Sequence, residues 1–163
     1  MTRIDWNISD MHKFTLRYNQ VVGTSDQTVN ASSAPNPRAS SARIGQNALS
    51  FAGSNYGFEN SVRSVTAELN STFSSVLSNQ FLATYSRIQD TRTSPSSPFP
   101  FVDIYKDGDQ YMNFGYELFS WENDVINNNY SFINNVSYLA GKHNLTGGAS
   151  FEIQNFGNSF QRY

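Results

Sequence analysis

Residues 64–74 alternate between polar and apolar side chains, and this two-residue period constrains the fold more than any other feature of the chain. The polar set comprises Ser64, Thr66, Glu68, Asn70, Thr72 and Ser74. The other set is mostly apolar and comprises Val65, Ala67, Leu69, Ser71 and Phe73. Because successive side chains of a β-strand point to opposite faces, the pattern predicts a strand with one polar and one apolar face.

The same alternation recurs along the chain and predicts about six strands, at residues 2–8, 13–22, 61–76, 80–92, 124–139 and 144–156. Tight connections at 9–12, 77–79 and 140–143 alternate along the chain with two long connections, at 23–60 and 93–123. Alternating strands of roughly ten residues, joined by short turns at one end and long loops at the other, are typical of transmembrane β-barrels of the outer membrane. We therefore expect an all-β fold, an antiparallel meander that forms part of such a barrel.

The composition fits a wall between water and lipid. Charged residues make up 15% of the chain and aromatic residues another 15%, whereas soluble domains carry roughly 25% charged residues. The net charge of −2 and the absence of cysteine argue against nucleic acid as a partner and exclude disulfide frameworks. A secreted soluble all-β module that binds carbohydrate or mediates adhesion has a similar composition, and composition alone does not separate the two.

The strand number predicts that the chain is incomplete. Barrels of this class contain about eight strands or more, and an open sheet edge is not tolerated in lipid. The residues after Met1 are already strand-like, and no signal peptide precedes them. We therefore expect an internal piece of a longer protein.

Several stretches resemble the barrel of TonB-dependent receptors, and most of all the Oar-like outer-membrane transporters of Bacteroidota-type bacteria. They are RIDWNISDMHKFTLRYN, VTAELNSTFSSVLSNQFLATYSRIQDTR, FPFVDIY, GYELFSWEND and YLAGKHNLTGGASFEIQNF. The resemblance covers nearly the whole chain apart from a variable stretch near 26–45. Each motif is short, and their order and spacing carry the likeness.

This resemblance implies a barrel of about 22 strands that is plugged by an N-terminal domain. Residues 1–163 would be part of that barrel, with external loops at about 23–60 and 93–123, and would contain neither the plug domain nor a signal peptide. The implied function is uptake of a ligand of the carbohydrate, peptide or siderophore class across the outer membrane. The implied partners are outer-membrane lipid, the rest of the barrel and its plug, the TonB-ExbB-ExbD energy complex and a surface lipoprotein. The secreted module remains the alternative function.

Aromatic side chains in the second long connection are the candidate ligand-binding residues. They are Phe99, Phe101, Tyr105, Tyr111, Tyr116 and Trp121. Aromatic side chains offer a large contact area at low entropy cost, so they suit a sugar, peptide or siderophore. They could equally pack the base of the loop or lie in the aromatic girdle at the membrane interface. The sequence YKDGD, residues 105–109, predicts a β-turn at a loop tip.

Catalytic, metal and cofactor chemistry are not expected, and we interpret the protein as a transporter and not an enzyme. His12 and His143 occupy equivalent places at two tight turns, so we read them as a repeated turn residue in preference to a metal pair. The serines lack a nucleophile elbow. Glu68 and Glu152 are expected to face a polar interior, although paired carboxylates could also serve catalysis. Gly147 and Gly148 are expected where the sheet is crowded.

Overall fold

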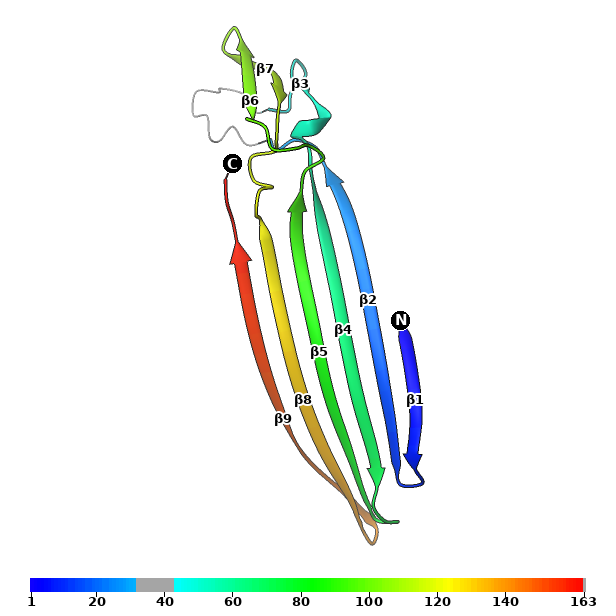
Figure 1. Cartoon of the computed structure of the whole chain (residues 1–163). Coiled ribbons are helices and arrows are strands. Elements are labelled where there is room, and N and C mark those ends of the chain that lie inside the picture. Colours follow the sequence, from blue (N-terminus) through cyan, green and yellow to red (C-terminus); the bar gives the residue numbers. More distant parts are fainter. Residues whose placement is uncertain (32–42, 163) are drawn as a thin grey trace. The chain divides into compact units, whose positions relative to one another are not determined.

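The computed structural model of the chain describes residues 1–31 and 43–162 and is almost entirely β-structure (Figure 1). The central part of the first predicted loop, residues 32–42, lies outside the described residues. The strands are β1 (Thr2–Ser9), β2 (His12–Gln27), β3 (Leu49–Ser50), β4 (Tyr56–Thr72), β5 (Leu77–Thr93), β6 (Val102–Lys106), β7 (Asp109–Phe114), β8 (Asp124–Ala140) and β9 (His143–Ser159). A 3₁₀ turn, η1 (Ala52–Ser54), precedes β4.

Six strands form the main sheet, in the order β1-β2-β4-β5-β8-β9. Figure 1 shows neighbouring strands running in alternating directions. In the first hairpin Trp6 lies opposite Phe14 on the apolar face, and Arg3 lies opposite Arg17 on the polar face. The predicted all-β meander of six strands is confirmed. In the part of the chain that the structure describes, no helix is long and apolar enough to span a membrane.

The predicted turn at 77–79 is wrong, because the connection between β4 and β5 consists of residues 73–76. The Ser74 hydroxyl oxygen accepts hydrogen bonds from the backbone N–H groups of Val76 and Leu77, at 3.3 and 3.1 Å. A serine hydroxyl that binds backbone two or three residues later offers the chain a turn in place of a strand. Ser78 and Asn79, which suggested the turn, belong to β5.

The described parts of both long connections contain more β-structure than the alternation predicts. Strand β2 continues to Gln27 and β4 begins at Tyr56, because polar residues extend these strands without an apolar pattern. The second connection contains a hairpin of β6 and β7, and a parallel pair of β3 with β7 completes a three-stranded sheet. Asp107 and Gly108 connect β6 to β7 with positive φ angles of 55° and 88°, which suits a two-residue hairpin turn. The turn predicted at 105–109 is thereby confirmed.

The chain divides into two compact units. The strand unit comprises residues 1–22, 61–89 and 126–157, and the loop unit comprises residues 23–60, 90–125 and 158–163.

Burial in the strand unit is inverted relative to a soluble domain. All the buried hydrophobic side chains of the described residues, Val29, Tyr116 and Leu118, belong to the loop unit. The buried residues of the strand unit are Thr15, Ser61 and Ser71. From Tyr130 to Tyr138 on β8, every second residue is exposed and all of these except Asn134 are apolar, while the intervening ones are half-buried. An exposed apolar face of this extent indicates contact with an apolar environment and not with water.

The polar face of the strand unit is hydrogen-bonded across its strands. Glu68 on β4 accepts a charge-assisted bond from Arg17 Nη2 on β2 at 2.9 Å, and also bonds from Asn70 and Gln80. On the β8–β9 hairpin, Ser137 and Thr146 hydroxyls lie 3.0 Å apart. The expectation that Glu68 faces a polar side of the sheet agrees with this network.

Two glycines mark crowded backbone. A Cβ atom at Gly148 would lie 2.7 Å from the Asn134 carbonyl oxygen and close to the Asn135 side chain, as expected for a crowded position, whereas Gly147 is open. Gly115 has a φ of +117°, and a Cβ there would lie 2.8 Å from the Phe101 Cα and closer still to the Pro100 carbonyl oxygen. Only glycine fits where backbone approaches backbone this closely with positive φ.

We predict that Gly115→Ala loosens the loop unit. The strained φ alone should cost about 1–3 kcal/mol, and the overlap with residues 100 and 101 adds to that cost. Limited proteolysis should show faster cleavage between residues 99 and 116. Gly45→Ala is the matched control, because a Cβ at Gly45 meets nothing within 4 Å. Equal cleavage rates of the two variants would contradict the prediction.

Candidate functional site

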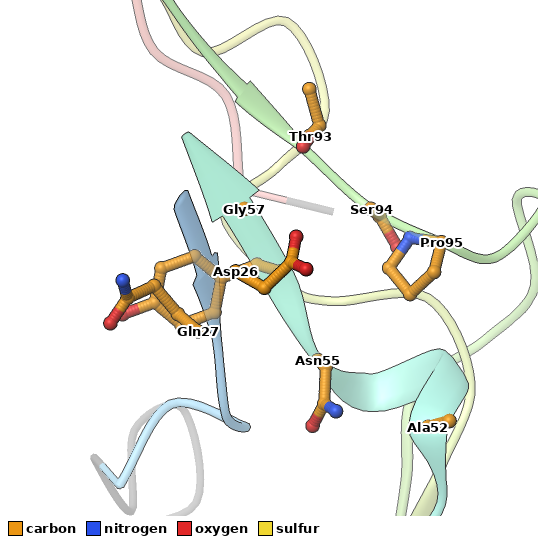
Figure 2. A pocket seen from close by; sticks show the side chains of 9 residues that line it. Asp26, Gln27, Ala52, Asn55, Gly57, Thr93, Ser94 and Pro95 are labelled. Atoms are coloured by element: carbon orange, nitrogen blue, oxygen red, sulfur yellow. The ribbon is translucent and has the colours of Figure 1, made fainter. Parts of the chain in front are cut away.

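A polar pocket of about 410 Å³ lies in the loop unit (Figure 2). It forms where the extended ends of three strands and the segment around η1 come together. Its lining residues are Asp26, Gln27, Ala52, Asn55, Tyr56, Gly57, Thr93, Ser94 and Pro95. None of them is lysine or arginine. The ends of β2, β4 and β5 that extend beyond the alternating pattern therefore supply five of the nine lining residues.

Gly57 keeps the pocket open. A Cβ atom at this buried position would lie 2.8 Å from Thr93 Oγ1 and 3.6 Å from Asp26 Oδ1, both of which belong to lining residues. A larger side chain here would therefore press into the pocket. Figure 2 shows the Asp26 carboxylate between β4 at Gly57 and the segment that carries Ser94 and Pro95.

Three polar side chains of the pocket have no hydrogen-bond partner among the described residues. They are the Asp26 carboxylate, the Asn55 amide and the Thr93 hydroxyl. Together they offer an acceptor of full negative charge, an amide that donates and accepts, and a hydroxyl group. This set suits the hydroxyl and amide groups of a neutral ligand and repels anions, because the formal charge in the pocket is negative.

The Tyr56 side of the pocket is held by an arginine. The Arg92 guanidinium carbon lies 3.7 Å from the Tyr56 ring centroid, and Nη2 forms an ion pair with Glu117 Oε1 at 2.9 Å. Glu117 is only 1% exposed, and its other oxygen accepts bonds from the Phe119 N–H and the Ser120 hydroxyl. A planar guanidinium that stacks and pairs at once fixes both groups in place.

The same arginine reaches a second aromatic pair. Its guanidinium carbon lies 5.7 Å from the Phe119 ring, and Phe119 stacks on Phe160 with ring centroids 6.2 Å apart and an interplanar angle of 18°. Phe160 directly follows β9. The pocket wall, the segment after residue 116 and the chain beyond β9 are thus joined through side chains.

The structure does not gather the six predicted aromatic residues into one surface. Tyr116 is buried and contacts the Trp121 ring at 6.2 Å, and Phe101 lies beneath the buried Arg43 guanidinium at 4.8 Å. Tyr105 is half-buried. Phe99, Tyr111 and Trp121 are exposed. Tyr116 and Phe101 therefore support the loop unit, and the ligand-binding role of the set stays a prediction.

An aromatic patch, defined here as Phe51, Phe99 and Phe114, joins the two long connections. The Phe114 ring lies 6.3 Å from Phe51 and 6.4 Å from Phe99, and the two outer rings are 50% and 52% exposed. Backbone bonds from the Phe51 N–H to the Asn113 carbonyl and from the Tyr116 N–H to the Phe99 carbonyl fix the three segments. Sequence reasoning missed Phe51, although the apolar alternation of Leu49 and Phe51 indicates the short strand before it.

The two histidines do not form a metal pair. His12 lies on β2 and His143 begins β9, and three strands separate these two strands in the sheet. His12 Nδ1 lies 2.9 Å from the Ser71 hydroxyl oxygen, and its ring contacts the edge of Phe73. Within the described ranges, no group of three or more histidine or carboxylate side chains could hold a metal ion.

Comparison of the sequence with models of known protein families identifies the family of this chain. The whole chain, residues 1–163, matches the family model described as "Outer membrane beta barrel domain". The chain belongs to this family. No curated protein and no solved structure shows a significant match to it.

Membership of the outer-membrane barrel domain explains the inverted burial. The protein is located in the outer membrane, as predicted, and the exposed apolar face of the strand unit is the face that lipid covers. From Tyr130 to Tyr138 this face extends eight residues along β8, or about 27 Å at ~3.4 Å per residue, close to the ~25 Å apolar band of such barrels. Asn134 interrupts the band and accepts a 2.8 Å bond from Asn79 Nδ2, so its amide is not left unpaired in lipid.

The two faces of the barrel domain should differ in their access to water. Single cysteines at Leu16, Leu69 or Phe151 should resist water-soluble thiol reagents in native membranes. Cysteines at the neighbouring positions Arg17, Asn70 and Glu152 should react faster, because they lie on the polar face, which water can reach. The measurement is the labelling rate in detergent-free outer membranes. Equal rates for the two sets would reject the assignment of the faces.

A lysine at Leu69 should destabilise the barrel domain by up to ~2–4 kcal/mol, the cost of a cation on the lipid face near the bilayer midplane. Asn70→Lys is the matched control, because it places the same side chain on the polar face one residue away. The free energy of unfolding can be compared in lipid vesicles by urea titration. The prediction fails if the two lysines cost the same.

Removal of the Glu117 carboxylate should loosen the pocket wall. Glu117→Ala leaves the largely buried Arg92 without its ion-pair partner, and breaking a buried pair costs about 3–5 kcal/mol. Protease sensitivity of the loop unit should rise, and the near-ultraviolet signal of its aromatic residues should change. The exposed Glu59→Ala is the control, and a similar response of both variants would contradict a supporting role for Glu117.

Proposed function

We propose that this outer-membrane barrel domain belongs to a TonB-dependent receptor of the Oar-like type and takes up a neutral polar ligand. The sequence resemblance supports the receptor type, which implies a barrel of about 22 strands around a plug domain. The carrying observation in the structure is the polar pocket, whose lining includes the Asp26 carboxylate, the Asn55 amide and the Thr93 hydroxyl. A loop unit that presents such groups is suited to capture a ligand.

The chemistry of the pocket favours a carbohydrate or a peptide over a ferric siderophore. A siderophore complex that carries negative charge needs a basic lining, whereas this lining contains a carboxylate, amides and hydroxyl groups. Such groups pair well with the hydroxyl groups of a sugar or with peptide amides. The exposed rings of Phe51 and Phe99 can pack against the apolar face of a sugar ring or against an apolar peptide side chain. Because Phe51 directly precedes Ala52 of the pocket lining, one ligand could contact both.

The proposed role involves binding and release without a chemical reaction, so neither a catalytic residue nor a cofactor is required. The plug domain would gate the lumen, and the TonB-ExbB-ExbD complex would supply the energy for the transport step. A surface lipoprotein would cover the captured ligand from outside. In this scheme the residues of the loop unit determine which ligand is held.

The pocket can be tested by binding to the intact receptor. Asp26→Ala combined with Asn55→Ala removes two unpartnered groups, and loss of one hydrogen bond to a charged group weakens binding about tenfold or more. The measurement is equilibrium binding to a panel of neutral oligosaccharides and short peptides. The control, Glu59→Ala combined with Asn47→Ala, removes the same functional groups outside the pocket. Identical binding by both double variants would remove the pocket from the proposal.

Energy coupling can be tested separately in cells. A protonophore, or deletion of the energy complex, should abolish uptake of the bound oligosaccharide or peptide while surface binding persists. Uptake that continues without the proton gradient would indicate a passive channel, even if the pocket binds the ligand. The two experiments therefore distinguish failure of the ligand site from failure of the receptor type.

A further inference from the structure

Two arginines, Arg63 on β4 and Arg87 on β5, lie directly opposite each other. The register of these strands follows from hydrogen-bonded pairs. The Phe73 N–H donates to the Leu77 carbonyl, and the Thr66 and Thr84 hydroxyls lie 3.3 Å apart, seven residues further along both strands. Three residues beyond that pair, the register places Arg63 beside Arg87. The bond from Asn60 to the Asp90 carboxylate, a further three residues along each strand, keeps the same spacing.

Both arginines belong to the lipid-covered face. Arg63 precedes Val65 by two residues and Arg87 follows Tyr85 by two, so each shares a face with the apolar residue below it. Tyr85 and Tyr130 contact each other across β5 and β8 with ring centroids 5.0 Å apart. Tyr85 also donates to Asn128 on β8 at 2.9 Å. The arginines therefore lie one step beyond an aromatic row, on the side away from the tight connections.

This position corresponds to the headgroup level of the outer leaflet. Outer-membrane barrels have their short turns in the periplasm and their long loops outside, and aromatic girdles border the apolar band. The aromatic row with Tyr85 and Tyr130 is the border nearer the long connections. Arginine side chains just beyond this border meet lipid headgroups, which carry phosphate.

An anion between Arg63 and Arg87 would offset the repulsion between their two positive charges. Like charges directly opposite on neighbouring strands are destabilising. Within residues 1–31 and 43–162, neither arginine forms an ion pair with a carboxylate. Arg87 Nε is buried and lacks a hydrogen-bond partner there, while Arg87 Nη2 donates only a long 3.3 Å bond to Gln89. Two guanidinium groups with unused donors on one face form a fork for phosphate oxygens.

We propose that Arg63 and Arg87 bind the phosphate of an anionic lipid headgroup in the outer leaflet. The phosphate would lie between the two guanidinium groups, neutralise their repulsion and accept hydrogen bonds from their terminal N–H groups. The acyl chains of the same lipid would continue along the apolar face past Tyr85. This site faces lipid and is independent of the ligand that the loop unit captures.

The test uses the intact protein in nanodiscs that contain phosphatidylcholine and phosphatidylglycerol. Native mass spectrometry counts the phosphatidylglycerol molecules that remain bound as the disc is stripped. Removing both arginines, Arg63→Gln with Arg87→Gln, should lower the apparent affinity for phosphatidylglycerol about tenfold or more. Phosphatidylcholine retention should not change. Lysine at both positions should retain part of the affinity, because it keeps the charge but loses the planar fork.

The control combines Lys13→Gln with Lys142→Gln and removes two positive charges elsewhere on the strand unit. Unboiled samples with folded-barrel mobility on gels establish that each variant is intact. Equal phosphatidylglycerol loss in the control would reduce the effect to net charge and overturn the site. Undiminished retention in the folded arginine variant would overturn it as well. Displacement of the lipid by equimolar inorganic phosphate would show that the arginines hold phosphate alone and reject the lipid assignment.

Discussion

The absence of water from the membrane interior is the constraint on which this structure depends. Every backbone N–H and C=O group in lipid needs a partner within the protein, so the strands pair side by side and polar side chains gather on one face. The hydrogen bonds around Glu68 and between Ser137 and Thr146 belong to that face. The apolar face remains exposed because lipid takes the place of a core. Among the described residues, the buried hydrophobic side chains Val29, Tyr116 and Leu118 all belong to the loop unit.

The strands could be predicted from sequence because their signal is local. Alternation with a period of two, as in residues 64–74, needs only the geometry of one strand and one difference between its two sides. The strand boundaries in the structure differ from the predicted ones where another local interaction overrides that pattern. The Ser74 hydroxyl forms the turn at 73–76, and the polar residues between Gly23 and Gln27 extend β2 although no apolar residue marks them.

The candidate site could not be predicted, because its residues come together only through the loop fold. Asp26, Asn55 and Thr93 are unremarkable polar residues in polar stretches, and no motif connects them. Of the predicted aromatic residues, Phe99 is exposed, whereas Tyr116 is buried and Phe101 lies against the Arg43 guanidinium, so the ligand-binding role of the set stays a prediction. The opposed arginines needed a strand register, which depends on where the turn lies. With the connection predicted at 77–79, the register of β4 and β5 would not place Arg63 opposite Arg87.

The stack that joins Tyr56, Arg92, Phe119 and Phe160 gives the pocket wall an unusual mechanical character. Tyr56 and Arg92 belong to the neighbouring strands β4 and β5, whereas Phe119 and Phe160 lie outside the strands and join the stack through contacts between flat faces. Flat aromatic faces remain attractive over a range of lateral offsets. A shift of the Phe119 and Phe160 rings can therefore be accommodated by sliding over the Arg92 guanidinium, without a change in the backbone hydrogen bonds of β4 and β5.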